Sequence, residues 1–191
     1  MKPIGLDGFA ARFAGEADPW GTFSKRDEAV KRTAILHALG PGPLGRVLEL
    51  ASGNGSNSAA VAPRALRLDA TEGTAEGSAL TAAAIERWPR SRATVLALPA
   101  RAPRARYDAV VLAELLYYLS PRDMAAVAQM VARVLRPGGV LVLAHHRIDF
   151  HDFAQHAAGI HRRFLRAMDA SWRVRAVRFT GKWQVVAARR I

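Results

Sequence analysis

The chain has 191 residues, of which half are hydrophobic, and a formal net charge of +12 at pH 7. This composition predicts a folded globular protein with a full core rather than a disordered chain. The absence of cysteine excludes disulfides, cysteine-ligated metals and a cysteine nucleophile, and we predict no metal site. No apolar run approaches the roughly 20 residues of a membrane span, and the first residues lack the apolar segment of a secretory signal. We therefore expect a cytoplasmic protein that does not bind a membrane.

Arginine carries nearly all of the positive charge, because lysine occurs only at Lys2, Lys25, Lys31 and Lys182. Together with abundant alanine, this pattern is typical of proteins from GC-rich genomes. The arginines are spread along the chain, with a denser cluster at residues 161–166. We interpret most of the charge as solvated surface, and we keep an anionic or sugar-like substrate and a nucleic acid as alternatives.

Helical patterns come first along the chain. An amphipathic stretch around Phe9 and Phe13 precedes a helix expected over residues 24–39, with Ser24 as its N-cap and Gly40-Pro41 as its stop. Beyond it, apolar runs predict strands at residues 46–50, 66–69, 93–98, 108–113, 140–144, 172–179 and 183–188. Further helices are expected at residues 76–88, 121–135 and 151–168.

Continuous apolar strands separated by helices predict a parallel sheet covered on both faces. The tight turn at residues 180–182 joins the last two runs into a hairpin, so the last strand should enter antiparallel. We therefore predict an α/β fold with a doubly wound, mostly parallel, seven-stranded Rossmann-like sheet and an antiparallel last strand. Residues 1–191 are expected to form a single domain, with a helical cap at 1–42 and the Rossmann-like core at 43–191.

A glycine-rich turn, Gly53-Asn54-Gly55, follows the first expected strand, where an α/β sheet binds its ligands. A nicotinamide site would use Gly-x-Gly-x-x-Gly, but Ser58 occupies the third glycine position. The negative charge of Glu49 would oppose a phosphate and suits an ammonium or sulfonium group instead. Asp69 is expected to end the second strand, where its carboxylate can accept both ribose hydroxyls. S-adenosylmethionine (SAM) meets all of these conditions.

Three segments, residues 47–55, 107–111 and 135–141, resemble successive signatures of class I SAM-dependent methyltransferases, in order and at suitable spacing. The resemblance implies SAM as cofactor and S-adenosylhomocysteine (SAH) as product. Two positions depart from the family pattern. Ala51 stands where the family often has its first glycine, and residues 98–100 lack the acid that usually meets the adenine amino group, so backbone groups are expected to serve there.

A closer resemblance is to the nodulation protein S-like branch, which consists of N-methyltransferases acting on an amino sugar of a chitin-type oligosaccharide. Residues 18–21, the helix at 24–39, residues 113–119 and the pair His145 and Arg147 carry this resemblance. It implies a small-molecule acceptor, most simply an amine nitrogen of an amino sugar or a similar metabolite. The branch also contains members of other or unknown substrate, so the acceptor stays open, as does the choice between N- and O-methylation.

The residues expected to contact the cofactor lie in the N-terminal motif, in the turn and at strand ends: Trp20, Glu49, Ala51, Gly53, Asn54, Gly55, Asp69, Ala70, Leu98, Pro99 and Ala113. For catalysis we predict His145 and Glu114. An imidazole at a strand end can take the proton of an amine acceptor near neutral pH, and alternation places His145 and His146 on opposite faces. Glu114, directly after the fourth strand, can hold an acceptor ammonium or cap the following turn.

Five further residues are expected to contact the acceptor: Tyr117, Tyr118, His146, Arg147 and His161. The tyrosines have a plain structural alternative as core, His161 as a surface residue, and one of His145 and His146 as a strand-end residue. Two other functions stay open. A nucleic-acid methyltransferase would suit the charge, although residues 114–117 lack the Asn/Asp-Pro-Pro-aromatic run of adenine-N6 enzymes. A catalytically silent SAM-binding interaction protein is the second alternative.

Overall fold

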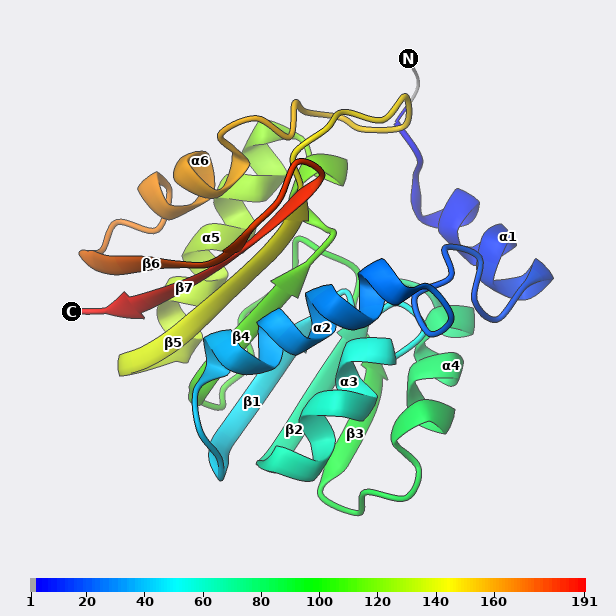
Figure 1. Ribbon diagram of the computed structural model, residues 1–191, viewed down its shortest axis with the longest axis horizontal. Helices are drawn as coiled ribbons and strands as arrows, with labels where there is room; N and C mark the ends of the chain where they lie inside the picture. Colours follow the sequence, from blue (N-terminus) through cyan, green and yellow to red (C-terminus); the bar gives the residue numbers. More distant parts are fainter. Residues whose placement is uncertain (1–2) are drawn as a thin grey trace.

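Seven strands form one sheet in the computed structural model, which describes residues 3–191 (Figure 1). The strands are β1 (Leu44–Leu50), β2 (Ala65–Glu72), β3 (Ser91–Val95), β4 (Tyr107–Ala113), β5 (Leu135–His146), β6 (Trp172–Phe179) and β7 (Trp183–Arg190). Their order is β3-β2-β1-β4-β5-β7-β6. Strands β1 to β5 pair in parallel, and β7 pairs antiparallel with both β5 and β6. The predicted doubly wound sheet with an antiparallel last strand is confirmed.

Helices cover both faces of this sheet (Figure 1). On one face lie α2 (Arg26–Leu39), α3 (Ser56–Val61) and α4 (Ala75–Ile85), and on the other α5 (Pro121–Val134) and α6 (Ile160–Arg166). The first helix, α1 (Leu6–Gly15), packs against α4, and two 3-10 turns, η1 (Ala62–Arg64) and η2 (Leu116–Tyr118), complete the elements. None of the helices in residues 3–191 is long and apolar enough to cross a membrane.

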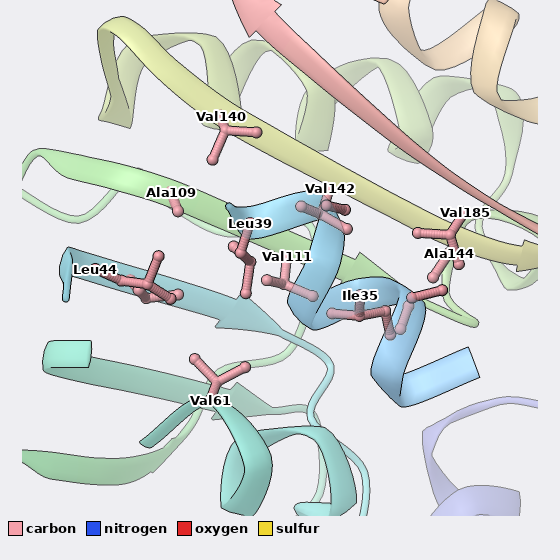
Figure 2. Close-up of a cluster of buried hydrophobic side chains, with 14 of the residues drawn as sticks. Ile35, Leu39, Leu44, Val61, Ala109, Val111, Val140, Val142, Ala144 and Val185 are labelled. Atoms are coloured by element: carbon pink, nitrogen blue, oxygen red, sulfur yellow. The ribbon is translucent and has the colours of Figure 1, made fainter. Parts of the chain in front are cut away.

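Alternation along the strands divides the core into two layers. Figure 2 shows one of them, where Val111 and Val142 of the sheet pack against Ile35 and Leu39 of α2. Their neighbours in sequence, such as Leu112, point to the opposite layer beneath α5 and α6. Each fully buried aliphatic side chain contributes about 1.5–3 kcal/mol relative to exposure. The two layers together hold the strand ends that carry the site.

Several elements differ from the sequence-based expectation. Strand β5 begins at Leu135 rather than at residue 140, and β3 ends at Val95 rather than at residue 98. Strand β2 does not stop at residue 69 but runs to Glu72, because Ala70 and Thr71 continue the pairing with β1. Helix α6 covers only Ile160–Arg166 of the expected 151–168, since the segment before it is an irregular loop. Helix α2 begins at Arg26, and the hydroxyl of Ser24 bonds to Asp18 instead of capping it.

The carboxyl ends of β1 and β4 are neighbours at the point where the strand order reverses. From β1 the chain turns outward to β2 and β3, and from β4 it turns the other way to β5. In such sheets the loops that leave these two strands diverge and open a crevice between them. The candidate site lies there.

Candidate active site

A cleft of about 530 Å³ opens at the carboxyl ends of β1, β2 and β4. Its volume falls within the usual range for small-molecule sites, roughly 300–1,000 Å³. Loops from the sheet form its floor, while α1 and the segment after it form its cover. The sequence-predicted residues that line it are Trp20, Ala51, Gly53, Asn54, Leu98, Ala113, Glu114, Tyr117, Tyr118 and His146.

The turn after β1 has an unusual backbone. Ala51, Gly53 and Gly55 all have positive φ angles, of 54°, 60° and 83°. Gly53 lines the cleft, but Gly55 does not, because it faces the interior. A Cβ atom on Gly55 would lie 2.8 Å from Cα of Thr81, so glycine there allows α3 and α4 to pack closely. The turn therefore brings backbone, rather than bulky side chains, to the floor of the cleft.

Asn54 ties this turn to the N-terminal cover. Its Nδ2 donates to the carbonyl of Ala17 (3.1 Å) and to Oδ1 of Asp18 (3.0 Å), and its Oδ1 accepts from the hydroxyl of Thr22 (2.8 Å). The same carboxylate of Asp18 accepts the backbone N–H groups of Thr22 and Phe23. Burial opposes these bonds, yet together they lower the pKa of Asp18. The cover is thus fixed to the floor by polar contacts.

Glu72 is the carboxylate at the end of β2. Its side chain lines the cleft and accepts hydrogen bonds from the backbone N–H groups of Gly53 (3.0 Å) and Thr74 (3.2 Å). Burial raises the pKa of Glu72 above its ordinary value. This residue has the place that sequence reasoning assigned to Asp69. The sequence does contain a signal for Glu72. The β-branched Thr71 favours a strand that continues past Asp69 and ends at Glu72.

Asp69 lies inside β2, away from the cleft, which contradicts its predicted place beside the cofactor. Its carboxylate pairs with Arg46 (2.9 Å), Arg92 (2.7 Å) and Arg67 (3.3 Å), and it accepts the hydroxyl of Tyr107 (2.9 Å). Burial alone would raise the pKa of Asp69, but these partners lower it. Burial and the same carboxylate raise the pKa of Tyr107 to about 12. Asp69 is therefore a structural residue.

We expect Asp69→Asn to destabilise the fold by about 2 kcal/mol at pH 7. Removing one member of a buried ion pair usually costs more, but the three arginines are partly exposed, so solvent screens part of the effect. Urea unfolding measures the loss, with Glu86→Gln, an exposed acid, as a control that should change stability by less than about 0.5 kcal/mol. The lowered pKa of Asp69 means that its contribution exists above 3.8 and is lost as the pH falls further. A large loss of SAH affinity in the folded variant would contradict this assignment.

Three more predicted cofactor residues lie outside the cleft lining. Glu49 is 1% exposed, its Oε2 bonds to the hydroxyl of Ser58, and its Oε1 has no partner among residues 3–191. Burial raises the pKa of Glu49 to about 7. Ala70 is fully buried within the extended β2 strand. Pro99 follows the lining residue Leu98 without lining the cleft itself.

Aromatic side chains form the cover. The ring of Trp20 packs against Phe13 at 5.2 Å between centroids and against Phe9 at 5.9 Å. Phe9 in turn meets Tyr118 edge-on at 5.0 Å. Because these rings come from α1, the following loop and η2, they join three separate segments over one cavity. Such a cover excludes water from whatever the cleft binds.

Glu114 is the polar centre of the other end of the cleft. Its backbone is held at a φ of 53°, and its Oε1 lies 2.7 Å from Nζ of Lys31. Lys31 also pairs with Glu28 at 2.8 Å, and the hydroxyl of Tyr117 donates to Glu114. Burial alone would lower the pKa of Lys31, but Glu114 and Glu28 raise it. Glu114 therefore stands beside a cation that stays charged, with 28% of its side chain exposed.

His145 does not face the cleft, which contradicts its predicted role as a catalytic base. It is fully buried, and its Nε2 accepts the backbone N–H groups of Leu115 (3.3 Å) and Leu116 (3.2 Å). Its Nδ1 lies 3.0 Å from Nε2 of His161. Both ring nitrogens are thus engaged, and burial holds the pKa of His145 well below its ordinary value. His145 instead holds the turn that carries Glu114.

His146 lines the cleft from the opposite face of β5, and His151 lines it as well. Nε2 of His146 lies 3.9 Å from Oε2 of Glu114, and its Nδ1 lies 3.3 Å from the carbonyl of Lys182. The other two predicted acceptor residues, Arg147 and His161, line a separate groove beside α6. His161 is buried with a pKa lowered to about 4, and burial is the cause.

A SAM-type cofactor fits the cleft in size and in polarity. Glu72 can accept ribose hydroxyls, the backbone of residues 51–54 can hold the amino-acid portion, and Leu96 and Leu98 offer an apolar wall to the adenine. Within residues 3–191, no group of three or more His, Asp or Glu side chains is arranged to hold a metal ion.

Comparisons with known proteins agree with this geometry. Residues 48–141 match the family model described as "Methyltransferase domain". The structure of the N-methyltransferase NodS from Bradyrhizobium japonicum WM9 in complex with SAH has a TM-score of 0.79 at 18% identity, covering 97% of both chains. A putative methyltransferase from Pseudomonas syringae has a TM-score of 0.73 at 22% identity, covering 87% of this chain and 100% of the other. A structure described as the DhpI-SAM-HEP complex has a TM-score of 0.75 at 21% identity, covering 96% and 95%.

No curated protein sequence matches the chain significantly. The matched domain, the sheet topology and the cleft together agree with the fold of class I SAM-dependent methyltransferases. The fold of this chain is similar to that of NodS, whose structure contains SAH, and to that of the DhpI complex, which contains SAM.

Proposed function

We propose that the protein transfers a methyl group from SAM to an amine nitrogen of a small-molecule acceptor, such as an amino sugar. The observation that carries this proposal is the pairing of His146 and Glu114 at one end of the cleft, 3.9 Å apart and both lining it. The similarity of the fold to that of the N-methyltransferase NodS supports the choice of nitrogen.

When bound, SAM supplies an activated methyl group on its sulfonium. The residues of this chain would hold the donor by Glu72 and the turn backbone, and would exclude water with the aromatic cover. Methyl transfer requires alignment of donor and acceptor, so most of the catalytic effect is expected from positioning. Trp20 and Tyr118 contribute to this by enclosing the cavity.

An amine acceptor must lose its proton before its lone pair can attack. Glu114 is suited to bind the ammonium form, because a carboxylate accepts charge-assisted hydrogen bonds. His146 is suited to receive the proton, because its imidazole lines the cleft beside Glu114 and can act as a general base. Lys31 and Tyr117 fix the orientation of Glu114 through the contacts described above.

Turnover with a panel of acceptors tests this proposal. Deacetylated chitin oligosaccharides, simple amino sugars, small amines and phenols would be incubated with SAM, and methylated product detected by mass. We expect an amine to be methylated, and His146→Ala to lower kcat/KM at least about 100-fold while SAH affinity stays within about threefold. His37→Ala, which removes an exposed histidine of α2, is the control and should change neither.

Two results would contradict parts of the proposal. Methylation of phenols alone would replace nitrogen by oxygen as the acceptor atom. SAH binding without turnover on any acceptor would favour a SAM-binding protein that does not catalyse.

A further inference from the structure

A second groove lies beside the C-terminal hairpin, and we call it the hairpin groove. Residues of helix α6 line one wall, and residues of strands β6 and β7 line the floor. Figure 1 shows α6 beside β6. It shares no lining residue with the cleft. The proposed methyl transfer uses none of its side chains, so its features need a separate explanation.

The floor of the hairpin groove is apolar and long. Val174 and Phe179 of β6 line it and are 51% and 62% exposed, although both are large hydrophobic residues. Leu165, Trp172 and Val186 extend the same surface. Strand β6 has eight residues, which at about 3.3 Å per residue gives an apolar track of roughly 25 Å. Exposed apolar residues that lie together in a groove, rather than singly on the surface, are a feature of ligand-binding grooves.

The rim is positively charged and carries no acid. Arg147, Arg162 and Arg166 line the groove, and no aspartate or glutamate does. Within residues 3–191, Arg162 and Arg166 form no ion pair. Residues 147–191 contain ten arginines and lysines against three aspartates, a net +7 of the total +12. The C-terminal quarter of the chain, which supplies the lining of this groove, therefore carries more than half of the net positive charge.

Two buried N–H donors lie among the lining residues without acceptors. Nε1 of Trp172 and Nδ1 of His161 have no hydrogen-bond partner within residues 3–191. His145 accepts at Nε2, so its proton is on Nδ1 and is donated to Nε2 of His161. The proton of the neutral His161 is consequently on Nδ1. Two of the residues that line the groove thus carry buried N–H groups that no acceptor within residues 3–191 satisfies.

We propose that the hairpin groove binds an aliphatic carboxylate, with the acyl chain on the apolar floor and the carboxylate held by Arg162 and Arg166. The long floor favours a linear chain, and the unpaired guanidinium groups favour an anionic head. A second copy of this chain is a poor occupant, because like charges on the two copies would repel each other. The proposal is independent of which acceptor the methyltransferase uses.

Decanoate, at concentrations below those at which it forms micelles, is the probe for this site. Titration followed by calorimetry and by tryptophan fluorescence should show saturable binding, and Trp172→Phe should remove the fluorescence change without abolishing the heat. Arg162→Gln/Arg166→Gln should weaken binding at least about tenfold, since two charge-assisted contacts are lost. The matched control, Arg122→Gln/Arg133→Gln, removes the same charge from α5 and should stay within about twofold.

Four results would overturn the proposal. The first is the absence of saturable decanoate binding, and the second is an equal loss of decanoate affinity in both double variants. The third is competition by SAH, which would place decanoate in the cleft. The fourth is equal affinity for uncharged decanol. Size-exclusion chromatography adds a fifth. A wild-type dimer that dissociates in Arg162→Gln/Arg166→Gln would show that the groove is an interface between copies.

Discussion

Glu72→Ala is expected to weaken SAH binding at least about 100-fold. The substitution removes a carboxylate that both faces the cleft and holds the backbone N–H groups of Gly53 and Thr74. Loss of two charge-assisted hydrogen bonds to a ligand, at about 1.5–3 kcal/mol each, accounts for an effect of this size. Isothermal titration calorimetry with SAH measures it directly.

A second variant keeps this test informative if Glu72→Ala folds poorly. Glu72→Gln retains the volume and one carbonyl oxygen, and we expect it to bind SAH at least about tenfold more weakly than the wild type. Glu76→Ala removes an exposed acid from the first turn of α4 and should stay within about twofold. Unchanged affinity in Glu72→Gln would mean that another group holds the ribose.

Acidification should destabilise the fold through the His145–His161 pair. Both histidines have pKa values below 6.5 because they are buried, so the unfolded chain binds more protons than the folded one below pH 6.5. Stability is then full above pH 6.5 and falls as the pH drops towards about 4, the pKa of His161. Between pH 7 and pH 5, His161 alone should cost about 2 kcal/mol. Protonated His145 could no longer accept the N–H groups of Leu115 and Leu116, so the Glu114 turn should loosen once the pH is low enough to protonate this buried ring.

Urea unfolding at pH 7 and pH 5 measures this dependence. His161→Gln should lose less stability on acidification than the wild type, because one proton-binding site is removed. His37→Gln, which alters an exposed histidine of α2, should behave as the wild type does. An equal pH dependence in His161→Gln and the wild type would assign the acid sensitivity to other groups.

The fold was predictable because its signals are local. Apolar runs such as residues 108–113 and 140–144 predict buried strands, whatever their position in a parallel sheet. Ser120 caps α5, as its residue type predicts. The glycine-rich turn also lies where its place after the first strand indicates. Periodicity and turn chemistry depend on residues that are close in sequence, so they can be recognised from the sequence alone.

The candidate site was less predictable because its decisive contacts join distant residues. Asp69 and Glu72 are both acids in one strand, and only the arginines at positions 46 and 92 show which of them is structural. Alternation separated His145 from His146 correctly, yet it could not show which face was the cleft. The face on which His145 lies is occupied by His161, which is sixteen residues further along the chain and contacts His145.

The two outer strands of the sheet, β3 and β6, each leave one side unpaired. Such a side offers free N–H and C=O groups to another chain and invites aggregation. Arg92 stands on β3, and Arg173, Arg175 and Arg178 stand exposed on β6. Two molecules that approach by these sides bring arginines together, and the repulsion reaches about 10 Å at 0.1 M salt. The excess of arginine therefore hinders aggregation through the open sides of the sheet, and this protection weakens as salt rises.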